Sequence, residues 1–79
     1  MKILLLEDDE LFNETITEFL TDNGHEITSA FNVDEAVDVT FEMIFDLYLF
    51  DINLPDGSGV KLLKSLRESG DITPAIFLT

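Results

Sequence analysis

Two strongly apolar segments, Lys2–Leu6 and Leu47–Ile52, constrain the fold of this chain more than any other feature of its sequence. Short apolar segments that end in polar or turn residues are typical of strands buried on both faces of a sheet. Each of the two is followed by a longer segment in which apolar residues recur at helical spacing. Strands that alternate with helices form a parallel sheet with helical crossovers, so the sequence predicts an α/β fold.

Helical spacing predicts three helices, over residues 10–23, 33 to about 44, and 60 to about 68. The second helix has a capping signal, because Glu35 follows Asn32 by the three residues of a capping box. Two further strands are predicted over Glu26–Ala30 and Pro74–Thr79. The residues expected to face the core are Ala36, Val37, Phe41 and Ile44 on the second helix, and Leu62, Leu63 and Leu66 on the third.

The chain length allows one small domain. A chain near 79 residues buries only about 60% of the surface that its unfolded form exposes. No cysteine is present, which excludes disulfides and thiolate metal sites. The sequence shows neither a signal peptide nor an apolar stretch near the ~20 residues that a membrane span requires. We therefore expect a cytoplasmic protein that does not enter membranes.

The charge balance is strongly acidic, with 17 Asp and Glu, only 4 Lys and Arg, and a formal net charge of −13. Nucleic-acid binding requires a basic surface that neutralises phosphates, so this balance argues against it. Divalent cations or a basic protein surface are better matched as partners. Scattered acids could serve only to keep a small apolar domain soluble, but that does not explain acids gathered at strand ends.

Acidic residues stand at the carboxyl ends of two predicted strands: Glu7 and Asp8 follow the first, and Asp51 lies at the end of Leu47–Ile52. If these strands are neighbours, the carboxylates converge at the edge where open α/β sheets bind ligands. Close carboxylates raise one another's pKa unless a cation neutralises them. Ligands that offer only oxygen suit a hard ion, Mg²⁺ above all. An aspartate beside such an ion can attack phosphorus and form an aspartyl phosphate.

Four segments resemble the receiver domains of two-component response regulators: Ile3–Asp9, Asp46–Leu47, Asp51–Gly59 and Pro74–Thr79. They occur in the order and at the spacing of that family, over the whole chain. The Glu-Asp-Asp form after the first strand is similar to the subfamily with winged-helix DNA-binding output domains. The resemblance implies a flavodoxin-like parallel sheet, truncated here to four strands in the order 2-1-3-4, with three helices.

The resemblance also implies a role for each site residue. Asp51 would accept a phosphoryl group from a histidine of a sensor kinase, in a reaction that requires Mg²⁺. Carboxylates of Asp8 and Asp51 would hold the metal, with Glu7 acting through a water and Asn53 through its backbone carbonyl. Thr79 would be the hydroxyl that reports phosphorylation. Such a domain is a signalling switch that regulates an output, in this subfamily transcription, and not a turnover enzyme.

The resemblance further implies secondary-structure elements of a receiver domain that residues 1–79 do not include. Residues 1–79 are interpreted as the N-terminal part of a receiver domain, without its fourth helix, fifth strand and fifth helix. The family's invariant lysine ends that fifth strand, so we expect weak binding of a divalent ion and poor acceptance of phosphoryl. We also expect a homo-oligomer, formed through the exposed edge of Pro74–Thr79 or the uncovered face of the sheet.

Other functions compete with this interpretation. The chain could be an adaptor whose acidic edge binds a basic partner without being phosphorylated. A hydrolase of the haloacid dehalogenase type would need a second Asp two residues after the nucleophile, where this chain has Asn53. A calcium loop starting at Asp51 would need Gly at its sixth position and Glu at its twelfth, which are Asp56 and Leu62 here. Asp56 is instead interpreted as a turn residue before Gly57.

Overall fold

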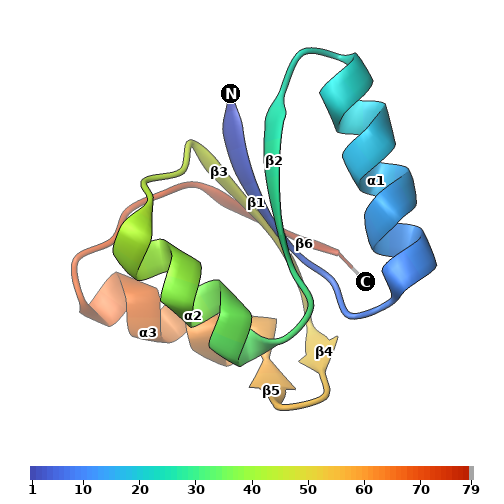
Figure 1. Ribbon diagram of the computed structural model, residues 1–79. Helices are drawn as coiled ribbons and strands as arrows, with labels where there is room; N and C mark the ends of the chain where they lie inside the picture. Colours follow the sequence, from blue (N-terminus) through green and yellow to red (C-terminus); the bar gives the residue numbers. More distant parts are fainter. Residues whose placement is uncertain (79) are drawn as a thin grey trace.

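The computed structural model describes residues 1–78 and has a four-stranded sheet at its centre (Figure 1). The strands are β1 (Lys2–Leu6), β2 (Glu26–Ala30), β3 (Leu47–Asp51) and β6 (Ala75–Leu78). Their spatial order is β2-β1-β3-β6, and the three pairings between them are parallel. Since β6 is the fourth of these strands along the chain, the predicted order 2-1-3-4 is confirmed.

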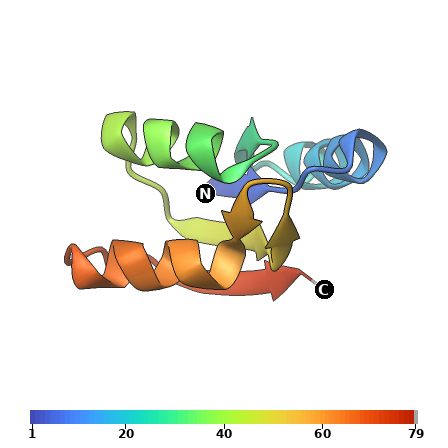
Figure 2. The ribbon, with the colours of Figure 1, turned by 90° about the horizontal axis from the view of Figure 1, so that it is seen from below.

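Three helices connect the strands: α1 (Glu10–Asp22), α2 (Val33–Glu42) and α3 (Gly59–Glu68). Figures 1 and 2 show α2 and α3 on one face of the sheet and α1 on the other. A short antiparallel hairpin, β4 (Asn53–Leu54) and β5 (Gly57–Ser58), follows β3. This hairpin was not predicted, because strands of two residues carry no hydrophobic periodicity. None of the helices within residues 1–78 has the length and apolar character that crossing a membrane requires.

The larger apolar cluster lies between the sheet and the helices α2 and α3. Its centre is formed by β1 and β3, whose side chains Leu4, Leu6 and Phe50 are fully buried. The ring of Tyr48 stacks on Phe50 with centroids 4.9 Å apart, which restricts the orientation of both rings. Both rings pack in the cluster with residues of β1, α2 and α3, and this packing fixes the position of β3 and the place where Asp51 leaves the sheet.

A smaller apolar cluster lies on the opposite face, where α1 packs on the sheet. Ile3, Leu5 and Leu49 from the strands contact Ile16 and Leu20 of the helix. Successive residues of β1 therefore point to opposite faces and are buried on both, as its uninterrupted apolar sequence predicts.

The structure corrects two of the core contacts expected for α2. Phe41 is 85% exposed and Ile44 is 88% exposed. The helix ends at Glu42, and its C-cap Met43 has extended backbone angles (φ −134°, ψ 152°), so Ile44 does not continue the apolar stripe. The helix packs on the sheet through the small, fully buried Ala36, while Phe41 lines a groove between α2 and α3.

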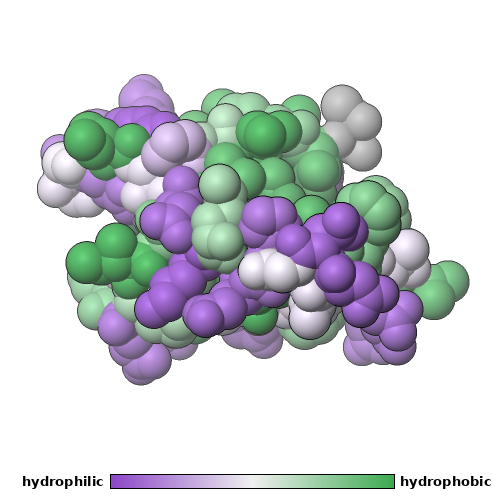
Figure 3. Space-filling model, turned by 90° about the horizontal axis from the view of Figure 1, so that it is seen from above, coloured by the Kyte–Doolittle hydropathy of each residue, from purple (hydrophilic) through white to green (hydrophobic). Residues whose placement is uncertain are grey.

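The edge strand β6 carries exposed apolar side chains on both faces of the sheet. Ile76 is 54% exposed and Phe77 is 37% exposed. Figure 3 shows a continuous area of apolar surface on one side of the molecule. Among the described residues β6 pairs only with β3, so its other edge presents unpaired backbone groups.

Candidate metal centre

The acidic residues at the ends of β1 and β3 come together in the structure. The two strands pair in parallel with Leu6 opposite Phe50, so Glu7 and Asp51 follow at the same edge of the sheet. Glu7, Asp8 and Asp51 each place one carboxylate oxygen within 4.8 Å of the others. The three residues thus form the acidic cluster that neighbouring strands were expected to create.

Backbone hydrogen bonds orient two of the three carboxylates. Oε2 of Glu7 accepts the N–H of Asp9 at 3.0 Å, and the Glu7 N–H donates to the Ala30 carbonyl on β2 at 3.0 Å. Oδ1 of Asp51 accepts the N–H of Ile52 at 2.8 Å. A carboxylate has about four lone-pair positions, so these bonds leave most of the acceptor capacity for a ligand.

A buried polar network behind the acidic cluster holds the turn after β1. Asn13 of α1 is 2% exposed, and its Nδ2 donates to the Glu7 carbonyl at 3.1 Å. Its Oδ1 accepts the hydroxyl of Ser29 on β2 at 2.7 Å. Asn13 was not predicted from the sequence. A signal for it does exist in the sequence. Asn13 is polar, yet it lies three residues before Ile16 and seven before Leu20, which places it on the apolar stripe of α1.

The environment of Glu7 opposes its ionisation. Burial raises the pKa of the Glu7 carboxyl above its ordinary value of 4.5, the hydrogen bond from Asp9 opposes this, and the charges of Asp51 and Asp8 raise the pKa further. Because the folded-state pKa lies above the unfolded one, stability decreases as the pH rises from 4.5 through the folded pKa. A divalent cation would offset the same repulsion, and a donor set of three carboxylates suits a hard ion such as Mg²⁺.

Replacing Glu7 with Gln is expected to stabilise the metal-free chain at pH 7 and to reduce the stabilisation that Mg²⁺ adds. Gln retains an Oε acceptor for the Asp9 N–H but removes a buried charge that faces two others. The gain should vanish below about pH 4.5, where Glu7 is protonated in the folded and unfolded chain alike. Urea denaturation with EDTA and with Mg²⁺ measures both effects, with Glu14→Gln on the exposed side of α1 as control. A metal-free Glu7→Gln chain less stable than the parent at pH 7 would contradict this account.

Gly59, at the start of α3, packs directly against the backbone of Asp51. Its N–H donates to the Ile52 carbonyl at 3.0 Å. A Cβ at this position would collide with the Asp51 carbonyl oxygen and lie 3.2 Å from Cβ of Phe50. No role was predicted for this glycine by itself, and the structure shows a close approach that leaves no room for a side chain.

The two other predicted site residues are Asn53 and Thr79. Asn53 belongs to β4, opposite Ser58, and its side chain is exposed two residues after Asp51. Thr79, the predicted switch hydroxyl, lies outside the described residues. The metal-binding and phosphoryl-accepting roles of the predicted residues remain predictions at this point.

The family model described as "Response regulator receiver domain" matches residues 3–79. Among curated relatives, the transcriptional regulatory protein DltR of Streptococcus agalactiae is 40% identical over 79 residues, which are 100% of this chain and 35% of DltR. The transcriptional regulatory protein CrdR of Helicobacter pylori is also 40% identical over 79 residues, covering 99% of this chain and 37% of CrdR. The chain therefore spans about a third of the length of these relatives.

Solved structures show the same fold. The receiver domain of the Francisella response regulator 1452 superimposes with a TM-score of 0.93 at 32% identity, over 96% of this chain and 63% of that chain. TrrA of Thermotoga maritima, solved in complex with Mg²⁺ and BeF, gives a TM-score of 0.85 at 30% identity, over 96% and 64%. Because the family match spans residues 3–79 and the fold recurs in solved receivers, this chain belongs to the response regulator receiver domains.

Proposed function

We propose that residues 1–79 act in a phosphoryl-accepting signalling switch, in which Asp51 receives a phosphoryl group from a histidine of a sensor kinase. The observation that carries this proposal is the meeting of Glu7, Asp8 and Asp51, with one oxygen of each within 4.8 Å of the others. The related TrrA, which was solved with Mg²⁺ and BeF, supports the same assignment. The names of DltR and CrdR support an output in transcription.

The proposed Mg²⁺ ligands are carboxylates of Asp8 and Asp51, Glu7 through a water, and the backbone carbonyl of Asn53. When bound, Mg²⁺ would offset negative charge on these carboxylates and on the phosphoryl oxygens. The Ile52 N–H holds one oxygen of Asp51 and so orients the carboxylate before reaction. An Asp51 oxygen then forms the bond to phosphorus as the phosphorus–nitrogen bond breaks, and the electron pair of that bond stays on the histidine nitrogen.

Further parts of the proposal rest on the family. We assign residues 1–79 to the N-terminal part of a receiver domain, and the chain covers only 63% and 64% of the two solved proteins. Thr79 is the proposed switch hydroxyl, a sensor histidine kinase is the proposed partner, and the cytoplasm is the proposed location. These assignments make the chain a phosphoacceptor for the kinase and not a turnover enzyme.

Incubation with a small phosphodonor tests the proposed acceptor. We expect slow incorporation that requires Mg²⁺ and that mass spectrometry of proteolytic fragments locates at Asp51. An adaptor with an unphosphorylated acidic edge would show no incorporation with or without Mg²⁺. Modification of a different aspartate, or incorporation that is unaffected by EDTA, would contradict the proposed site.

We also propose that the exposed edge of β6 associates with a second copy of the chain. Ile76 and Phe77 supply apolar contact area, and the strand edge that has no partner within residues 1–78 supplies backbone donors and acceptors. Sedimentation velocity at micromolar concentration should give a mass above that of one chain. Ile76→Lys should restore the monomer, whereas Ile72→Lys, at an 87% exposed position outside the strand, should not. A monomeric mass for the unmodified chain would overturn this proposal.

A further inference from the structure

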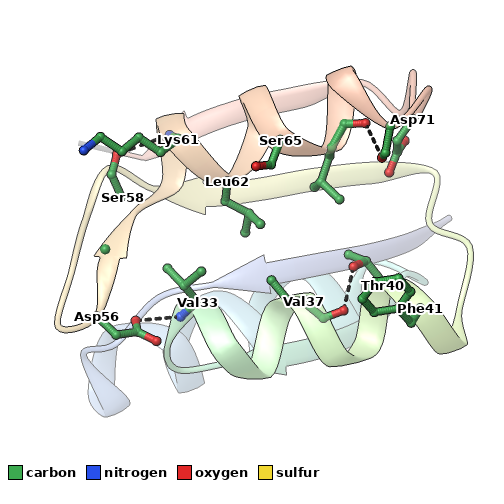
Figure 4. A pocket seen from close by; sticks show the side chains of 13 residues that line it. Val33, Val37, Thr40, Phe41, Asp56, Ser58, Lys61, Leu62, Ser65 and Asp71 are labelled. Atoms are coloured by element: carbon green, nitrogen blue, oxygen red, sulfur yellow. Dashed lines mark hydrogen bonds between the residues drawn. The ribbon is translucent and has the colours of Figure 1, made fainter.

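The first turn of α2 donates hydrogen bonds to a residue far away in the sequence. Oδ1 of Asp56 accepts the N–H of Val33 at 2.8 Å, and Oδ2 accepts the N–H of Asp34 at 3.1 Å. The next N–H, that of Glu35, donates to Oδ1 of the N-cap Asn32 at 2.8 Å. Helices leave their first N–H groups without partners in the helix, so two of these groups on α2 depend on Asp56. Figure 4 shows Asp56 reaching from its hairpin to Val33.

Asp56 lies at the tip of the β4–β5 hairpin, between Leu54 and Gly57. This hairpin forms a separate two-stranded sheet and does not join the main sheet. A hairpin of this size is not stable by itself, so contacts with the rest of the fold must fix its position. At its base the Gly59 N–H bonds to the Ile52 carbonyl. At its tip, Gly57 packs against Val33 of α2. A Cβ added to Gly57 would lie 3.3 Å from Cγ2 of Val33, so the turn lies directly against the helix.

The charge of Asp56 matches its position. Hydrogen bonding to the Val33 N–H is the main cause that lowers the pKa of Asp56; desolvation opposes it, and the Asp34 N–H adds to it. The carboxylate therefore stays ionised at the positive end of the α2 dipole at neutral pH. The sequence analysis interpreted Asp56 only as a turn residue, and the structure adds a long-range contact to that role.

We propose that Asp56 is a positioning residue for the magnesium site, because it anchors the tip of the hairpin whose first strand carries the Asn53 carbonyl. This inference rests on the proposed function, in which that carbonyl is a metal ligand. The chain from Asp51 to Asp56 is short, so a fixed tip restricts the backbone at Asn53. By reciprocity, bound Mg²⁺ must strengthen the contact between Asp56 and α2 by the same factor that the contact strengthens Mg²⁺ binding.

Mg²⁺ titration by isothermal calorimetry tests this role in the parent chain, Asp56→Ala, Asp56→Asn and two controls. Asn32→Ala removes the other cap of α2 without touching the hairpin, and Asp34→Asn removes an equal charge from the same turn. We expect Asp56→Ala to bind Mg²⁺ roughly tenfold more weakly, at the low end of the range for groups that orient metal ligands. Asp56→Asn should be intermediate, since its amide keeps one acceptor. The controls should lie within about twofold of the parent, because neither alters the hairpin anchor.

The possible outcomes separate the positioning role from the proposed function. If the parent binds Mg²⁺ and both Asp56 variants bind equally well, Asp56 is only a helix cap and the inference is overturned while the metal site stands. If Asn32→Ala weakens binding as much as Asp56→Ala, the effect acts through α2 and the inference is again overturned. If the parent binds no Mg²⁺ at all, the proposed function itself fails.

Hydrogen exchange supplies a readout that a purely structural cap would not change. In the parent, added Mg²⁺ should slow exchange of the Val33 and Asp34 amides, which donate to Asp56. In Asp56→Asn the slowing should be reduced at both amides. If the parent chain binds Mg²⁺ but the exchange rates of these two amides do not change, the inference is overturned.

Discussion

The Asp51→Asn variant is expected to take up no phosphoryl group and to bind Mg²⁺ more weakly by at least about tenfold, the lower bound for groups that support metal ligands. The amide lacks the negative oxygen that would attack phosphorus and donate to the metal. Its Oδ1 can still accept the Ile52 N–H, so the turn after β3 is retained. One of the charges that raise the pKa of Glu7 is removed, so the metal-free variant should be no less stable than the parent.

Phosphoryl incorporation from a small phosphodonor and calorimetric titration of Mg²⁺ measure the two effects. Asp38→Asn is the matched control, because it removes the same charge from an exposed position of α2. We expect the control to behave as the parent in both measurements. Unchanged Mg²⁺ affinity in Asp51→Asn would exclude Asp51 as a metal ligand, and unchanged incorporation would exclude it as the acceptor.

The Gly59→Ala variant is expected to lose about 2 kcal/mol or more of its free energy of unfolding, as overpacked sites typically do. Alanine normally favours a helix over glycine by about 1 kcal/mol, so helix propensity alone predicts the opposite sign. The added Cβ would meet the Asp51 carbonyl oxygen and the Phe50 side chain, and backbone cannot move aside as a flexible side chain can. We therefore expect the collision to outweigh the gain in propensity.

The same substitution should also weaken Mg²⁺ binding, because relief of the collision displaces the backbone of Asp51. Urea denaturation gives the change in stability, and titration on the folded variant gives the change in affinity. Ser65→Ala adds no bulk at an exposed position of the same helix and should not destabilise the chain. A Gly59→Ala chain at least as stable as the parent would show that α3 can shift without cost, contrary to this account.

The sheet and the helices were predictable because their apolar patterns are long and regular. Burial of β1 on both faces follows from consecutive apolar residues such as Leu4 and Leu5, and the capping signal at Asn32 correctly marked the start of α2. The exposure of Phe41 and Ile44 was not predictable from spacing. Ile44 lies beyond the end of α2 at Glu42, and Phe41 lines the groove beside the helix instead of packing on the sheet.

The acidic cluster was predictable in outline, since it requires only that β1 and β3 be neighbours. The residues that support it were not predictable to the same degree. Asn13 acts through the backbone of Glu7, and Gly59 acts through the space it leaves beside Asp51. The contact of Asp56 with α2 joins segments 22 and 23 residues apart and has no local signature. Such contacts depend on tertiary geometry that neither residue spacing nor composition reports.

Titration of Mg²⁺ by NMR, with and without beryllium fluoride, tests the central claim most directly. We expect saturable shifts of the backbone amides at Glu7, Asp8 and residues 51–53, and tighter Mg²⁺ binding when beryllium fluoride is present. Shifts that do not saturate, or that spread over exposed acids of α1 and α2 while the ends of β1 and β3 stay unchanged, would contradict it.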